Sequence, residues 1–106
     1  MRYQIAVYVP LSHVDAVKNA VFSAGAGRFS GYQDCCWQTE GYGQFMPMAD
    51  SDPYVGEKGK VTYQKEMKLE FFSDSDCIHS VISALKKAHP YEVPAFCVSE
   101  HCHVFD

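Results

Sequence analysis

The sequence predicts an α+β fold in which four strands form one antiparallel sheet and two helices cover one of its faces. Three observations support this fold class. Residues 2–9 and 61–72 alternate between apolar and polar side chains, as half-buried strands do. Residues 14–24 and 78–85 repeat apolar side chains at helical spacing. The chain has 106 residues, so we expect a single domain over 1–106.

The first predicted strand, 2–9, ends at Pro10 because proline has no amide to donate to a strand ladder. A helix follows, with Ser12 as the candidate N-cap. Gly25 and Gly27 end this helix, since glycine readily adopts the backbone geometry found after a helix. Its expected buried stripe consists of Val14, Val17, Val21 and Ala24.

A second strand is expected over 32–40. The segment 41–60 that follows is rich in glycine and proline, and we predict a long, ordered loop that packs on another part of the protein. A short strand near 43–47 is an alternative for part of it. The third predicted strand, 61–72, then carries five apolar side chains on one face.

Ser73 is the candidate N-cap of the second helix, and Pro90 ends it. Its buried stripe is expected to consist of Ile78, Val81, Ile82 and Leu85. The last strand follows Pro94. Strands and helices therefore alternate as in a ferredoxin-like βαββαβ sandwich, with both helices on one face of an antiparallel sheet.

Charge and composition exclude several classes of function. The formal net charge is -4 and no basic stripe is present, which excludes nucleic acid as a partner. No segment approaches the roughly 20 apolar residues of a membrane helix, and the N-terminus does not resemble a signal peptide, so no membrane association is expected. The five cysteines form no C-x-x-C pair, which favours reduced thiols and a cytoplasmic protein.

Two stretches carry a more specific pattern. The first is His-Pro-Tyr-Glu-Val-Pro at 89–94, directly after a predicted helix. The second is a spacing of small, aromatic and other residues: Gly25, Gly27, Gly31, Tyr32, Cys35, Glu40, Gly41, Gly43, Phe45, Pro47, Pro53, Gly56, Gly59 and Lys60. The first stretch resembles the CutA proteins, trimeric relatives of the PII signal proteins linked to divalent-metal tolerance. Together, the two resemble the PII/CutA-like domain inserted in YqfO-type proteins, over nearly the whole chain.

YqfO-type proteins are dinuclear-metal proteins of poorly defined function, and their metal site lies in the domains that flank this insert. The resemblance therefore implies a free-standing accessory module without catalytic residues of its own. It also implies a homo-oligomer, with a trimer favoured and a dimer as the alternative. No nucleophile elbow or catalytic triad signature is present in the sequence.

The turn 89–94 has two interpretations. Its prolines force the chain out of helical geometry, so the motif can be a structural turn. Alternatively, Tyr91 and Glu92 face a cleft between subunits, with His89 as a ligand or proton carrier.

Glycines in 41–60 offer another candidate site. Backbone amides near Gly41, Gly43, Gly56 and Gly59 could approach a ligand closely, with Lys60 beside them. The spacing is not that of a phosphate-binding P-loop. We therefore favour a loop that packs across a neighbouring subunit, with nucleotide binding as the alternative.

The C-terminal His101 and His103 would point the same way in a strand, about 6–7 Å apart. They could share a divalent metal ion with a third ligand from elsewhere. The alternative is an exposed chain end. Cys35 and Cys36 would face opposite sides of a strand, one buried and one near the surface, and Trp37 is expected in the core.

The sequence favours a non-enzymatic oligomeric module that binds a metal ion or small ligand at subunit clefts and signals to a partner protein. One alternative is a structural cap that oligomerises and binds no small molecule. A third hypothesis is a small metal-dependent hydrolase that uses His89, Glu92 and the tail histidines, although no residue spacing requires it.

Overall fold

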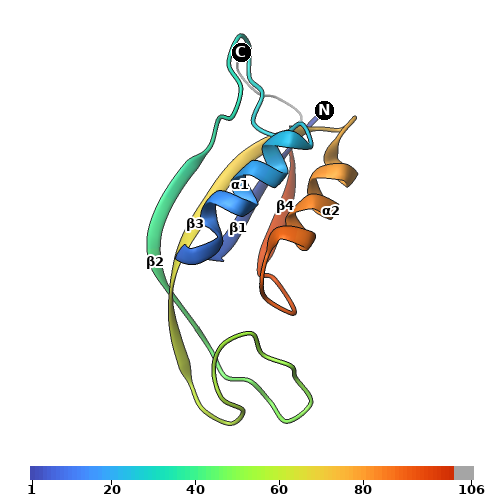
Figure 1. The fold of residues 1–106 in the computed structure, drawn as a ribbon. Helices are drawn as coiled ribbons and strands as arrows, with labels where there is room; N and C mark the ends of the chain where they lie inside the picture. The colour runs from blue at the N-terminus through green and yellow to red at the C-terminus, as the bar shows by residue number, and fades with distance from the viewer. Residues whose placement is uncertain (102–106) are drawn as a thin grey trace.

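The computed structural model describes the backbone of residues 1–101 and the side chains of residues 1–100. The elements are β1 (Arg2–Pro10), a short 3-10 helix η1 (Leu11–His13), α1 (Val14–Ser23), β2 (Trp37–Phe45), β3 (Thr62–Asp74), α2 (Ile78–Ala88) and β4 (Phe96–His101). The strands form one antiparallel sheet in the order β2-β3-β1-β4. Both helices lie on the same side of it (Figure 1). The structure confirms the predicted ferredoxin-like α+β fold.

The core lies between the sheet and the two helices. Alternate residues of β1 are fully buried, and the stripes of both helices pack against them. The largest fully buried apolar side chains are Ile5, Val7, Val9, Val17, Val21, Leu69, Val81 and Leu85. Each contributes roughly 1.5–3 kcal/mol by leaving water. The apolar periodicity of the sequence therefore identified most of the core. The predicted apolar face of 61–72 is wrong at its start, because β3 begins at Thr62 and the side chains of Val61 and Tyr63 are 51% and 68% exposed.

Strand β2 differs from its prediction at both ends. It begins at Trp37 and runs to Phe45, so the loop predicted from residue 41 starts only after Phe45. The alternative of a short strand near 43–47 is correct for residues 43–45, which continue β2. Gly41 and Gly43 lie within the ladder, opposite Glu66 and Gln64 of β3. Glycine weakens a strand, which is why the sequence indicated a loop here. Pairing to the long strand β3 outweighs that preference.

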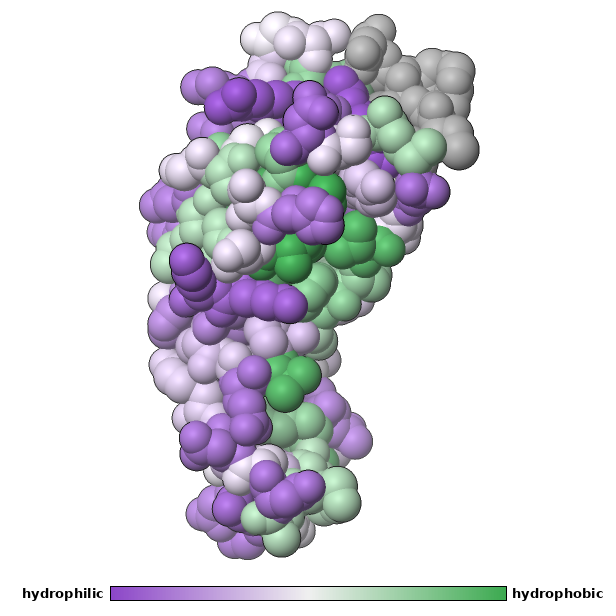
Figure 2. All heavy atoms as spheres, turned by 90° about the vertical axis from the view of Figure 1, so that its right-hand side faces the viewer, coloured by the Kyte–Doolittle hydropathy of each residue, from purple (hydrophilic) through white to green (hydrophobic). Residues whose placement is uncertain are grey.

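The β2–β3 hairpin extends beyond the helices, and its connecting loop, residues 46–61, folds back toward the turn between α2 and β4 (Figure 1). The molecule is therefore elongated, measuring 47 × 24 × 22 Å. It narrows between a broad upper part and the lobe at the end of the hairpin (Figure 2). No helix in residues 1–101 has both the length and the apolar character needed to cross a membrane.

Neither predicted serine cap is present. Ser73 belongs to β3 and is buried, and its hydroxyl donates to the Asp74 carbonyl and lies 3.3 Å from Cys77 Sγ. Ser12 lies within η1 and its hydroxyl contacts His13 Nδ1 at 2.8 Å. The sequence placed both helix starts too early because β3 continues into the expected cap and η1 precedes α1.

The prediction of Trp37 as a core residue is wrong. Its side chain is 69% exposed, and its indole N–H donates to Thr39 Oγ1 at 3.1 Å. Trp37 lies opposite Glu70 of β3, whereas its neighbour Gln38 lies opposite the buried Leu69 and accepts a hydrogen bond from Lys18 of α1. Successive residues of a strand face opposite sides of the sheet, so Trp37 is on the face that the helices do not cover. Cys35 and Cys36 are both half-buried, rather than one buried and one exposed.

Candidate ligand-binding site

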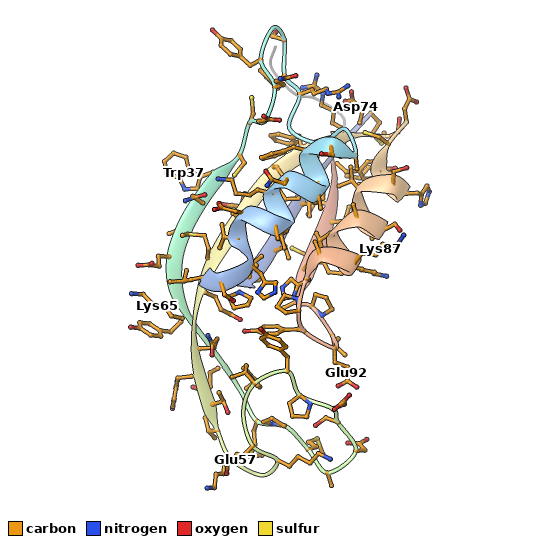
Figure 3. The ribbon with its side chains drawn as sticks, viewed as in Figure 1. Trp37, Glu57, Lys65, Asp74, Lys87 and Glu92 are labelled. Carbon is orange, nitrogen blue, oxygen red and sulfur yellow. The ribbon has the colours of Figure 1, made fainter. Side chains whose placement is uncertain are left out.

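A cavity of about 260 Å³ lies between the hairpin loop and the turn that follows α2. Its walls include Phe45, Pro47, Tyr54, Glu66, Tyr91 and Glu92. Glu92 lies at the tip of the turn, beside the loop (Figure 3), and accepts a hydrogen bond from the Asp52 amide at 3.1 Å. This cavity brings Tyr91 and Glu92, two of the predicted site residues, to one place.

A larger cavity of about 390 Å³ lies near the start of β2 and is lined by Arg28, Cys35, Cys36 and Trp37 among others. Burial raises the pKa of the Cys36 thiol, so this cavity does not contain an activated thiolate at that position. The smaller cavity is the better candidate because it contains a buried carboxylate as well as the sequence motif.

His89 holds the turn in place. Pro90 keeps it out of helical geometry, with φ -76° and ψ 134°, and its side chain is only 5% exposed. Its Nε2–H donates to the Tyr8 carbonyl at 2.6 Å, and its Nδ1 accepts from the Tyr91 amide at 3.2 Å. Burial lowers the pKa of His89, which favours the neutral ring that this pattern requires. Both ring nitrogens are engaged, so neither is free to bind a metal ion.

Glu66 is the functional candidate that the sequence did not reveal. It is only 8% exposed, and its Oε2 accepts a hydrogen bond from the Tyr91 hydroxyl at 2.8 Å. Burial, followed by the bond to this carboxylate, raises the pKa of Tyr91. The alternation of β3 assigned Glu66 to the polar face, and only the glycines on the facing strand signalled that something packs there.

Aromatic rings surround the Tyr91 side chain. Its ring centroid lies 6.2 Å from that of Phe45, 6.2 Å from that of Tyr54 and 4.8 Å from that of His89. The Tyr54 ring also packs edge-on against His13 at 5.9 Å. These rings come from β2, the loop, the turn and η1. The site therefore joins segments that are far apart in the sequence.

The predicted glycine site separates into two groups. A Cβ at Gly43 would overlap Glu66 Oε1 and lie 2.9 Å from its Cδ, so Gly43 makes room for this carboxylate. Gly41, in strand β2, lines a second groove together with Glu66. Gly56 and Gly59 have φ values of +96° and +82°, a left-handed geometry that glycine adopts readily, so their role is to let the loop backbone turn.

Lys60 forms an exposed ion pair with Glu57 at 2.9 Å. It is not among the residues that line the cavity. The structure therefore does not gather the glycines and Lys60 into one phosphate-binding nest.

The predicted metal pair lies outside the described side chains. The backbone of His101 ends β4, opposite Arg2, and His103 lies outside the described residues. Within the described part of the chain, no group of three or more His, Cys, Asp or Glu residues could hold a metal ion.

The Tyr91–Glu66 bond predicts a pH-dependent loss of stability. Because the folded-state pKa of Tyr91 is above its ordinary value of about 10, its contribution is present below about pH 10 and is lost as the pH rises. We expect the free energy of unfolding of wild type and Tyr91→Phe to differ less at about pH 11 than at about pH 8. Urea unfolding at both pH values measures this, with Tyr42→Phe, at an exposed site, as the control. An unchanged difference would contradict the assignment.

Comparison with known proteins shows which proteins the chain is similar to. No family model matches the chain. A protein of Mycobacterium leprae (strain TN) named GTP cyclohydrolase 1 type 2 homolog is 46% identical over 90 residues, which cover 85% of this chain and 23% of that protein. The chain thus spans about a quarter of the length of the curated relatives that it matches.

Solved structures give a similar result. A Bacillus cereus protein related to NIF3 superposes with a TM-score of 0.81 and 30% identity, over 96% of this chain and 26% of that one. CutA from Archaeoglobus fulgidus gives a TM-score of 0.70 at 16% identity, over 99% of this chain and 88% of CutA. GlnK of B. subtilis gives a TM-score of 0.62 at 13% identity, over 95% of this chain and 85% of GlnK. These likenesses confirm the PII/CutA-like fold and show similarity to one part of larger NIF3-related proteins.

Proposed function

We propose that this chain is a non-enzymatic PII/CutA-like module of the NIF3/YqfO type, which binds a metal ion or small ligand at subunit clefts and signals that state to a partner, with the cavity beside Glu66 as the place for a small ligand. The observation that carries the proposal is the buried Glu66 carboxylate, which borders a cavity and has no ion-pair partner among the described residues. A non-enzymatic role is supported by His89, whose ring nitrogens are both engaged in holding the turn.

The link to a partner is proposed through the hairpin loop. The loop meets the turn through the Asp52–Glu92 hydrogen bond and the Tyr54–Tyr91 ring contact. A ligand between the two would alter both contacts. The loop also exposes the apolar side chains of Met46 and Met48, which suit contact with another protein surface.

We further propose that the module acts as a homo-oligomer, with a trimer favoured, so that clefts between subunits complete the site. Strand β2 supports this because it pairs only with β3 within the described residues. Its outer edge therefore offers backbone groups for pairing with another chain. A cytoplasmic location is supported by the free thiols of Cys35, Cys36, Cys77 and Cys97.

Native mass spectrometry of the untagged protein, before and after chelation, tests the proposal. We expect a trimer with one ligand per subunit, and Glu66→Gln should keep the oligomer but lose the ligand. Glu57→Gln, at an exposed loop residue, is the matched control. An oligomer with nothing bound, and with no thermal shift for any metal, amine or nucleotide tried, would contradict ligand binding. That result would favour the structural cap.

A further inference from the structure

Among the described residues, none forms an ion pair with the buried carboxylate of Glu66. This side chain is 8% exposed and accepts one hydrogen bond from a neutral hydroxyl, so it keeps acceptor capacity for a charged donor. The two lysines of β3 pair with other acids, Lys65 with Glu40 at 3.6 Å and Lys68 with Glu70 at 3.5 Å, although Lys68 also lines the groove that Glu66 borders. Within the described residues, Glu66 receives only the neutral Tyr91 hydroxyl.

The Glu66 side chain lines two hollows of the molecule. Glu66 lines the cavity beside Phe45 and Tyr91, and it also borders the groove near Gly41. Its Oε2 accepts the tyrosine hydroxyl, whereas no hydrogen bond to its Oε1 is formed by the described residues. That second oxygen lies against Gly43, where the missing side chain leaves it space.

The cavity walls favour a cation over an anion. Two carboxylates, Glu66 and Glu92, line it, and no lysine, arginine or histidine does so among the described residues. The remaining walls include three aromatic rings, those of Phe45, Tyr54 and Tyr91, whose faces attract positive charge. A nucleotide phosphate would meet acidic side chains here and no basic ones.

The same walls favour an organic cation over a bare metal ion. No third histidine, cysteine or acid joins the two glutamates in a group that could coordinate metal, within residues 1–101. The cavity of about 260 Å³ is slightly smaller than sites for drug-sized ligands, which span about 300–1,000 Å³. It therefore suits a group of a few heavy atoms with an apolar stem.

We infer that this cavity binds the ammonium group of a small alkylamine, or of a lysine side chain presented by a partner, between the Glu66 carboxylate and the rings of Tyr54 and Tyr91. This inference rests on the proposed function, because it names the ligand class of the same cavity. The ammonium group supplies the charged donor. Its alkyl stem lies along the aromatic and proline walls.

Amide NMR titration of the intact protein with n-butylammonium chloride is the test, with 1-butanol and sodium chloride as controls. We expect butylammonium, but neither control, to shift the amides of Asp52, Tyr91 and Glu92. Removing the charge with Glu66→Gln keeps an acceptor for Tyr91 and should weaken binding about tenfold or more. The matched variant Glu57→Gln should bind as wild type does.

A second pair of variants tests the inference without changing a buried residue. Tyr54 is 57% exposed, so Tyr54→Leu should fold normally and weaken butylammonium binding about threefold to fivefold through the lost ring face. Tyr42→Leu, at a 75% exposed ring outside the cavity, should have no effect. Equal binding of 1-butanol, or unchanged affinity in Glu66→Gln, would overturn the inference.

Two comparisons separate the remaining outcomes. If a metal ion or nucleotide shifts the cavity amides and butylammonium does not, the organic-cation inference fails while the proposed function stands. If no ligand of any class shifts them, both fail. A capped lysine tripeptide that binds more tightly than butylammonium would identify a protein partner as the source of the ammonium group. Weaker binding of the tripeptide would identify a free amine as the source. Either result supports the inference.

Discussion

Replacing His89 with alanine is expected to lower the free energy of unfolding by about 3 kcal/mol. The Tyr8 carbonyl would lose the donor that now lies 2.6 Å away, and the Tyr91 amide would lose its acceptor. The missing imidazole would also leave an empty space, because the His89 side chain is only 5% exposed. Urea unfolding near neutral pH measures the loss, because the wild-type ring is neutral there.

His79→Ala is the matched control, since this exposed histidine lies in α2, the helix that ends just before His89. Its effect should stay within about 0.5 kcal/mol. A loss of less than about 1 kcal/mol in His89→Ala would show that the turn does not depend on the ring, and would contradict its structural role.

Gly27→Ala is expected to cost about 3 kcal/mol of stability. Gly27 has φ +77°, and its amide donates to the Phe72 carbonyl at 2.8 Å while its own carbonyl accepts from the Cys35 amide at 2.8 Å. A Cβ there would lie 2.9 Å from the Cys35 carbonyl oxygen and 2.9 Å from Phe22 Cε1. In Gly27→Ala, backbone strain and steric overlap therefore both contribute to the loss of stability.

Two other glycines separate these causes. Gly59 has φ +82°, but no atom lies within 4 Å of the place that an alanine methyl group would take, so Gly59→Ala should cost only the backbone part, about 1 kcal/mol. Gly31 has neither feature, and Gly31→Ala should be neutral within about 0.5 kcal/mol. Equal losses at Gly27 and Gly59, measured by thermal and urea unfolding, would refute the role of crowding.

The order of elements and most of the core were predictable from periodicity alone, although periodicity also assigned the exposed Val61 and Tyr63 to an apolar face. Apolar residues recur at the spacing of a strand or helix wherever one face is buried, so Val17, Leu85 and their neighbours could be assigned without coordinates. The end of β2 could not be. Gly41 and Gly43 indicate a loop by local preference, and only the register with β3 shows that they belong to a strand.

The site was predictable in part. The motif at 89–94 pointed to Tyr91 and Glu92, and both line the cavity. Glu66 was missed because alternation shows only which face a polar residue lies on, not whether another segment covers that face. The cover comes from Tyr91, which β3 meets only in the folded chain. The prediction for Trp37 was wrong because its register with β3 places it opposite Glu70, on the sheet face that the helices leave open, and the sequence alone does not show that register.

The fit between Gly43 and Glu66 sets an order in which the two sites can change during evolution. A side chain at Gly43 would collide with the Glu66 carboxylate, which Tyr91 holds in place. A larger residue that appears first at the first site must push the Glu66 carboxylate aside and disturb its bond to Tyr91. Shortening the second site first avoids that step. Each site thus determines which substitutions the other can accept, although they lie on different strands.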